Sequence, residues 1–268
     1  MSISIAVQMY SLREDAKVDL LATLKNVKDM GYDGVEFAGL YGHEPEEVAE
    51  MCQKVGLTPI SAHLNFNRML EDARKELSTH KAIGVKYGGI SSIAKEYRPC
   101  TENFDKVYGL FEEWGKLAKE YGIQLMYHNH DFEFVKMNGK YMIDDLYENV
   151  SAEALAAEFD TCWIRSPGED PVKYIKKYAG RVPVLHFKDL YGTQFEDKNR
   201  ADGVFPTKAL DHKYRHLGAG IVDISACLEA AKESGCQWIV VEQDYPTDGM
   251  TAADCARESA KYLRSLGL

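Results

Sequence analysis

Short apolar runs rich in β-branched and aromatic residues alternate with longer amphipathic segments along the whole chain. A run of this kind, bounded by turn residues, is typical of a strand that is buried on both faces. The runs lie at residues 3–9, 34–38, 58–64, 86–91, 123–129, 155–160, 182–188 and 238–243. The pattern therefore predicts eight strands that follow one another from end to end.

The segments between these strands have the spacing of amphipathic helices. Leu20, Leu24 and Val27 repeat at roughly 3.6 residues, and Gly31 supplies a stop. Thr101 stands where the N-cap of a later helix is expected. The clearest predicted helices cover residues 18–31, 44–56, 101–122, 222–235 and 251–267.

Dividing 268 residues by eight gives one strand-helix unit per roughly 33 residues, which fits a closed (β/α)8 TIM barrel of the α/β class. We expect a single barrel domain over residues 1–268. An open doubly wound sheet would carry a Gly-rich phosphate turn after an early strand, and the first strand here runs into QMYSLRED instead. The long irregular stretch at about 190–220 is predicted to cover the catalytic face.

The hydrophobic content of the chain indicates a folded protein, and its net charge limits the classes of molecule that it binds. The chain is 45% hydrophobic, and its net charge of -10 argues against nucleic-acid binding through phosphate contacts. The N-terminus lacks the features of a signal peptide, and no apolar run approaches the roughly 18 to 20 residues that span a bilayer. Six scattered cysteines without a C-x-x-C pair indicate a reducing compartment. We expect a cytoplasmic protein with no membrane partner, and a homo-oligomer stays open.

The carboxyl ends of the predicted strands, where barrel enzymes carry their reactive groups, are polar. Asp160, His186 and Glu242 follow apolar runs on three successive strands. One such residue alone is more often a surface or capping group, but three behind buried runs favour a site. Carboxylates and an imidazole that converge on one axis suit a divalent ion such as Mn, Co, Zn or Mg.

Eight short motifs lie in order along nearly the whole chain. They are QMYSLRED, GYDGVEFAG, SAHL, YHNHDFEF, EFDTCW, LHFKD, HLGAGIVD and VVEQD. Each is a weak signal alone, but in this order and spacing the chain resembles the sugar phosphate isomerase/epimerase family of the xylose-isomerase-like barrel superfamily.

The resemblance implies one divalent metal ion held by a Glu on strand five, an Asp on six, a His on seven and a Glu on eight. The last three carry over to Asp160, His186 and Glu242. Strand five departs from the pattern, because this chain has His-Asn-His, beginning at His128, where many relatives have Glu-Asn-His. Either His128 replaces the carboxylate, Glu133 turns into the site, or three protein ligands suffice. We prefer His128.

In the ketose epimerases that the chain resembles, metal-bound glutamates on strands five and eight move a proton next to a polarised carbonyl. Glu242 is therefore the clearest predicted base, with His128 and Lys188 as further catalytic candidates. Lys188 either stabilises an enolate oxygen or a carboxylate, or pairs with Asp189 at the rim.

The remaining polar strand ends are predicted substrate contacts. The candidates are Glu36, His63, His130, Trp163 and Lys188. Three of them have structural alternatives: Glu36 in a salt bridge with a barrel neighbour, His63 bonded to a backbone carbonyl, and Trp163 as a packing anchor.

The sequence thus predicts a metal-dependent isomerase or epimerase of a small sugar, polyol or keto-sugar. The alternative is a lyase, either similar to inosose dehydratase or acting on 3-keto-glycosides, which the histidines of strand five favour. A DNA-repair enzyme similar to endonuclease IV is opposed by the net charge of -10 and by too few ligand candidates. A non-catalytic sugar-binding barrel is opposed by the presence of Asp160, His186 and Glu242.

Overall fold

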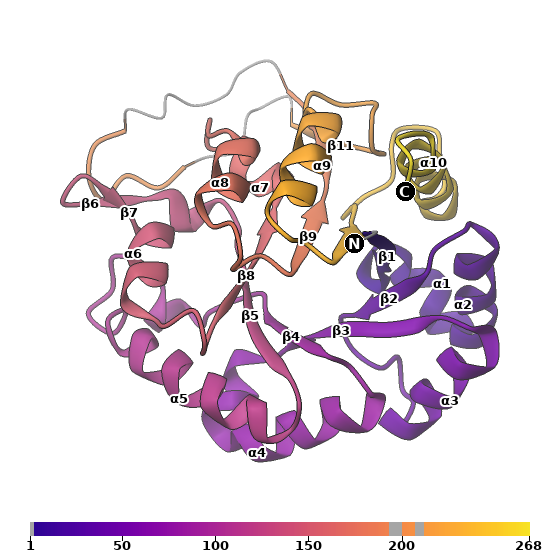
Figure 1. Ribbon diagram of the computed structural model, residues 1–268, viewed down its shortest axis with the longest axis horizontal. Coiled ribbons are helices and arrows are strands. Elements are labelled where there is room, and N and C mark those ends of the chain that lie inside the picture. Colours follow the sequence, from indigo (N-terminus) through magenta and orange to yellow (C-terminus); the bar gives the residue numbers. More distant parts are fainter. Residues whose placement is uncertain (1–2, 193–199, 207–211) are drawn as a thin grey trace.

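A computed structural model describes residues 3–192, 200–206 and 212–268, and in it eight parallel strands close into a barrel. Helices surround the barrel on its outside (Figure 1). The barrel strands are β1 (Ser4–Gln8), β2 (Gly34–Phe37), β3 (Thr58–Leu64), β4 (Tyr87–Ile90), β5 (Gln124–His128), β8 (Ala156–Asp160), β9 (Val184–Phe187) and β12 (Trp238–Val241). All eight overlap the predicted runs, so the predicted (β/α)8 TIM barrel is confirmed.

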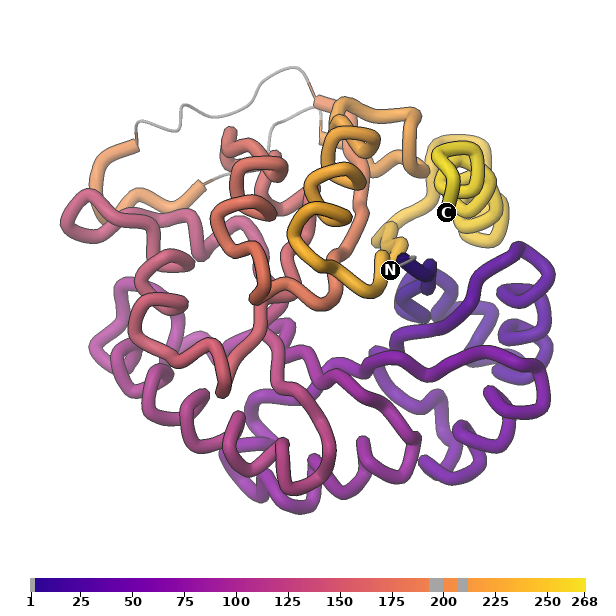
Figure 2. The backbone as a smooth tube through the Cα atoms, viewed as in Figure 1, coloured from indigo at the N-terminus to yellow at the C-terminus, as the bar shows by residue number. Residues whose placement is uncertain are grey.

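The barrel closes where the first strand meets the last. Strand β1 pairs in parallel with β2 on one side and with β12 on the other, with Ala6 opposite Val240. This pairing places the first and last barrel strands side by side, and in the tube of Figure 2 the indigo start of the chain meets its yellow end there. Every barrel strand thus has two neighbours, which leaves no barrel edge exposed.

The predicted helices correspond to α2 (Leu20–Asp29), α3 (Pro45–Val55), α5 (Lys106–Glu120), α9 (Ile224–Glu233) and α10 (Ala252–Ser265). No helix in the described part of the chain is long and apolar enough to cross a membrane. The helices are α1 (Arg13–Val18), α2 (Leu20–Asp29), α3 (Pro45–Val55), α4 (Phe66–Ile83), α5 (Lys106–Glu120), α6 (Met142–Asn149), α7 (Thr161–Arg165), α8 (Pro171–Lys177), α9 (Ile224–Glu233) and α10 (Ala252–Ser265), with 3-10 turns η1 (Met9–Leu12), η2 (Lys95–Tyr97) and η3 (Phe132–Phe134).

One predicted helix start is wrong. Helix α5 begins at Lys106, and Thr101 is not its N-cap. The Thr101 hydroxyl instead donates to the backbone carbonyls of Glu96 and Arg98. The residues between Thr101 and the helix form turns, because this hydroxyl closes the preceding loop rather than the first turn of α5.

The interior of the barrel is apolar near the amino ends of the strands and polar near their carboxyl ends. Side chains two apart on a strand share a face, and five members of the apolar layer each precede a buried polar residue by two. Such pairs are Ala6 and Gln8, Met126 and His128, Ala156 and Glu158, Val184 and His186, and Val240 and Glu242. The apolar layer at the amino ends of the strands therefore closes the barrel beneath the polar groups.

The segment after β9 starts with a small antiparallel sheet of β10 (Asp189–Tyr191) and β11 (Lys213–Arg215). A second small sheet, of β6 (Lys136–Met137) and β7 (Lys140–Tyr141), follows η3. The Asp189 carboxylate accepts hydrogen bonds from the backbone N–H groups of Gly218, Gly220 and Val222. Residues 193–199 and 207–211 lie outside the described residues, so the cover over the catalytic face stays a prediction.

Candidate metal centre

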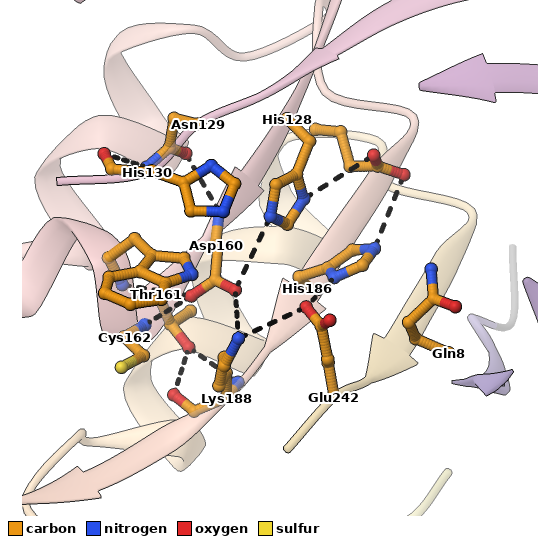
Figure 3. Close-up of polar contacts among 12 residues, drawn as sticks. Gln8, His128, Asn129, His130, Asp160, Thr161, Cys162, His186, Lys188 and Glu242 are labelled. Atoms are coloured by element: carbon orange, nitrogen blue, oxygen red, sulfur yellow. Dashed lines mark hydrogen bonds and ion pairs between the residues drawn. The ribbon is translucent and has the colours of Figure 1, made fainter. Parts of the chain in front are cut away.

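Four buried side chains converge at the carboxyl end of the barrel. His128 ends β5, Asp160 ends β8, His186 lies in β9 and Glu242 directly follows β12. One ligand atom of each lies within 4.8 Å of the others. Figure 3 shows these side chains pointing toward one another from separate strands. We call these four residues the metal centre, because two imidazoles and two carboxylates at this spacing suit a divalent cation.

Asp160 is held by one of its oxygens and offers the other. Its Oδ1 caps α7, accepting hydrogen bonds from the backbone N–H groups of Cys162 at 2.8 Å and Trp163 at 3.0 Å. Its Oδ2 is buried without a hydrogen-bond donor and lies 3.9 Å from His128 Nε2. Its ion pairs with His128 and Lys188 are long, at 3.9 Å each, so this buried oxygen without a hydrogen bond fits the role of a metal ligand.

Asn129, between the two histidines of strand five, supports the same arrangement. Its side-chain Oδ1 accepts a hydrogen bond of 3.0 Å from the backbone N–H of Asp160. The asparagine therefore joins the end of β5 to the end of β8, which are adjacent strands in the barrel. This contact sets the relative position of His128 and Asp160.

In each imidazole of the metal centre, one nitrogen faces a carboxylate of the metal centre. The other nitrogen faces a carboxylate outside it. His186 Nδ1 lies 3.1 Å from Glu242 Oε2, and His186 Nε2 lies 2.8 Å from Glu36 Oε1. His128 Nε2 faces Asp160, and its Nδ1 lies 3.6 Å from Glu158 Oε2. Histidines that bind metals are commonly oriented by a carboxylate at their second nitrogen.

Negative charge dominates this end of the barrel. Burial and the nearby Glu242 raise the pKa of Asp160 to about 7, against the opposing effect of Lys188. Burial alone would lower the pKa of His186, but Glu36 and Glu158 hold it well above its usual value. A bound cation would stabilise the ionised carboxylates directly.

Lys188 pairs with the end of β12 rather than with its sequence neighbour. Its Nζ lies 2.7 Å from Asp244 Oδ1 and 3.4 Å from Glu242 Oε2, and Figure 3 draws the contact with Glu242. The predicted alternative of a pair with Asp189 is wrong, because consecutive residues point to opposite faces and Asp189 binds the loop backbone. Lys188 also lies 5.0 Å from the Trp163 ring centre.

A cavity of about 940 Å³ opens above the metal centre. Of the predicted substrate contacts, His63, His130, Trp163 and Lys188 line it, together with His128, Glu242 and Asp244. The Lys188 ammonium, the indole of Trp163 and several imidazoles therefore surround the space where a small polar molecule would bind.

Glu36 is a fully buried residue and not part of the cavity wall. Its carboxylate accepts hydrogen bonds from Gln8 and Ser61 and lies 3.0 Å from His63 Nε2. Burial alone would lower the pKa of His63, but Glu36 and Glu158 raise it to about 10. Glu36 thus corresponds to the predicted salt bridge between barrel neighbours, and it could influence a substrate only through its partners.

Two carboxylates near strand five differ in their surroundings. Glu133 accepts hydrogen bonds from the Tyr127 hydroxyl and the backbone N–H of His130. Among the described residues, it belongs to neither cluster of side chains that could bind a metal ion. Glu158 is not among the site residues predicted from the sequence, yet it lies with His63, His128 and His186 in a second group of side chains that could bind a metal ion. Its position two residues before Asp160 was the available signal, since it puts both side chains on the inner face.

Comparison with known proteins gives four results. The family model described as "Xylose isomerase-like TIM barrel" matches residues 24–266. Inosose dehydratase from Lacticaseibacillus casei is 24% identical over 255 residues, covering 87% of this chain and 85% of that protein. A structure of a sugar phosphate isomerase/epimerase from Parabacteroides distasonis has a TM-score of 0.81 at 21% identity, over 99% of this chain and 95% of that one. A structure of the IolI protein with a zinc atom has a TM-score of 0.75 at 19% identity, over 98% of both chains.

Proposed function

Because the chain belongs to the xylose isomerase-like TIM barrel family, we propose that it is a metal-dependent isomerase or epimerase of a small sugar, polyol or keto-sugar. The observation that carries this proposal is the metal centre: four buried side chains of ligand type at the bottom of a cavity that Lys188 and Glu242 line. The sugar-related names of the similar proteins support the substrate class.

His128, Asp160, His186 and Glu242 would hold the ion, and a divalent ion bound there supplies the polarisation that makes hydrogen next to a carbonyl acidic. Glu242 lies at the cavity wall, where its carboxylate accepts that proton as general base. The Lys188 ammonium, 3.4 Å from Glu242 Oε2, stabilises negative charge on a substrate oxygen. Trp163 beside it gives a flat apolar face against which a sugar ring packs.

A lyase is the second candidate, because a metal centre with one glutamate suits elimination as well as it suits isomerisation. With His128 in strand five, the metal centre contains a single glutamate, Glu242, and so lacks a second glutamate for proton return on the opposite face of the substrate. One-base chemistry suits aldose-ketose isomerisation and β-elimination of water alike. The dehydratase name of a similar protein agrees with elimination.

Turnover in deuterated water separates these functions. Purified protein loaded with Mn, Co, Mg or Zn is incubated with a panel of keto-sugars and cyclic keto-polyols, and the products are followed by NMR and mass spectrometry. Isomerisation or epimerisation conserves mass apart from deuterium exchange, whereas elimination loses water. Absence of exchange and of product with every metal and substrate class would contradict the proposal.

The identity of the strand-five ligand gives a separate prediction. His128→Ala is expected to weaken divalent-metal binding by more than the roughly 100-fold that outer-shell changes cost, because a ligand nitrogen is lost. Glu133→Gln is the matched control, since this buried carboxylate binds Tyr127 and the His130 backbone instead. Titration calorimetry of both folded variants with Zn²⁺ measures the effect. The reverse order of losses would assign Glu133 as the ligand.

A further inference from the structure

We infer that Glu158 is a positioning residue of the metal centre, which orients the rings of His128 and His186 from beneath. This inference rests on the proposed metal site. Glu158 lies in β8, two residues before Asp160, so the two carboxylates share the inner face of one strand. Asp160 faces the proposed ion, and Glu158 faces the far nitrogens of the ligand rings.

The contacts of Glu158 converge on histidines. Its Oε2 lies 3.6 Å from His128 Nδ1 and 3.7 Å from His63 Nε2, and its Oε1 lies 3.5 Å from His186 Nε2. The side chain is fully buried, and neither oxygen has a hydrogen bond within the described part of the chain. A buried carboxylate with no conventional donor is kept there by the imidazoles around it.

This arrangement selects the ring nitrogens that are free to bind a cation. A neutral imidazole carries its proton on one nitrogen and a lone pair on the other, and the proton stays on the nitrogen that faces a carboxylate. Glu158 therefore keeps the proton of His128 on Nδ1, which leaves the Nε2 lone pair directed at Asp160. In His186, Glu36 and Glu158 together face Nε2 and leave Nδ1 beside Glu242.

The space around Glu158 also depends on Gly89, which has no side chain to fill it. Gly89 lies in β4, and a Cβ atom at this position would approach Glu158 Oε2 to 2.5 Å and His63 Cδ2 to 3.3 Å. Any larger residue would therefore displace the carboxylate from its place under the histidines. The Glu158 carboxylate, to which we assign the orienting role, thus occupies the space that Gly89 leaves.

A second cation held by Glu158 is the competing interpretation, because His63, His128, Glu158 and His186 are themselves of ligand type and closely spaced. With the first ion in place, that arrangement would require the rings of both His128 and His186 to bind metal through both nitrogens. Each ring would then have to lose its remaining proton. A single ion, with Glu158 as the carboxylate that faces the protonated ring nitrogens, avoids this requirement.

The test compares Glu158→Gln and Gly89→Ala with the wild-type protein and with the buried-carboxylate control Glu133→Gln. Calorimetry with Zn²⁺ gives stoichiometry and affinity, the absorption spectrum of the Co²⁺-loaded protein reports ligand geometry, and circular dichroism monitors folding. We expect one ion per chain in the wild type and a loss of affinity of roughly 10- to 100-fold in Glu158→Gln, with an altered Co²⁺ spectrum. Gly89→Ala should change affinity and spectrum in the same direction, and Glu133→Gln should change neither.

Unchanged affinity and spectrum in folded Glu158→Gln would overturn the positioning role while leaving the proposed function intact. Two ions in the wild type and one in Glu158→Gln would overturn it in favour of a second metal site. A wild-type protein that binds no divalent ion would overturn the proposed metal site as well. Where Glu158→Gln does not fold, Gly89→Ala decides, because it retains every carboxylate and every ligand.

Discussion

Asp160→Asn is expected to lower divalent-metal affinity by more than about 100-fold and to leave the barrel folded. Oδ1 of Asp160 caps α7, and an asparagine oxygen performs that task equally well. Oδ2 is the buried oxygen without a hydrogen-bond donor, and an asparagine whose oxygen keeps the cap would present an amide NH2 there, which does not bind a cation. The loss should therefore appear in metal binding and not in secondary structure. Calorimetry with Zn²⁺ or Mn²⁺ and circular dichroism measure the two effects.

Asp170→Asn provides the matched control for this prediction. Asp170 caps α8 by accepting a hydrogen bond from the backbone N–H of Val172, and it lies outside the metal centre. The same change of a capping aspartate should leave metal affinity at the wild-type value. Equal losses in both variants would mean that Asp160 acts on the fold and not on the ion.

Glu242→Gln is expected to reduce kcat by about 10²- to 10⁴-fold, the usual contribution of a general base. Glutamine has nearly the same shape and keeps an oxygen that can bind the ion, but it does not accept the substrate proton. Metal content should therefore stay near one ion per chain while deuterium exchange into substrate is lost. The assay is turnover of whichever compound the deuterated-water panel identifies, with the variant and the wild type loaded with the same metal.

Glu133→Gln is the control for this change, since it neutralises a buried carboxylate that does not line the cavity. It should retain kcat, and KM in Glu242→Gln should change much less than kcat because the base acts in the transition state. Wild-type turnover in metal-loaded Glu242→Gln would show that Glu242 is not the base. The imidazoles at the cavity would then be the candidates.

The fold could be predicted because barrel strands are buried on both faces and so appear as continuous apolar runs between amphipathic helices. The run at 238–243, for example, contains β12 in full. The start of α5 could not be predicted, because whether Thr101 bonds forward or backward depends on the shape of the loop before it. Both directions are compatible with the residue type.

The convergence of His128, Asp160, His186 and Glu242 could be predicted because all four lie at or near the carboxyl ends of strands, which meet at one end of a barrel. Glu158 was missed because it lies inside the apolar run of β8, where a charged residue looks like an interruption. Its partners come from β3, β5 and β9, so only the closed barrel brings them together. The partner of Lys188 was likewise set by strand adjacency, since β9 and β12 are neighbours and bring Asp244 to its ammonium.

The decisive measurement of metal binding at the barrel end is anomalous diffraction from crystals of the protein grown with Zn²⁺. We expect one strong peak per chain, with donor atoms of His128, Asp160, His186 and Glu242 at about 2.0–2.2 Å, the usual zinc distances to nitrogen and oxygen. Crystals that take up zinc elsewhere but show no peak among these four residues would contradict it.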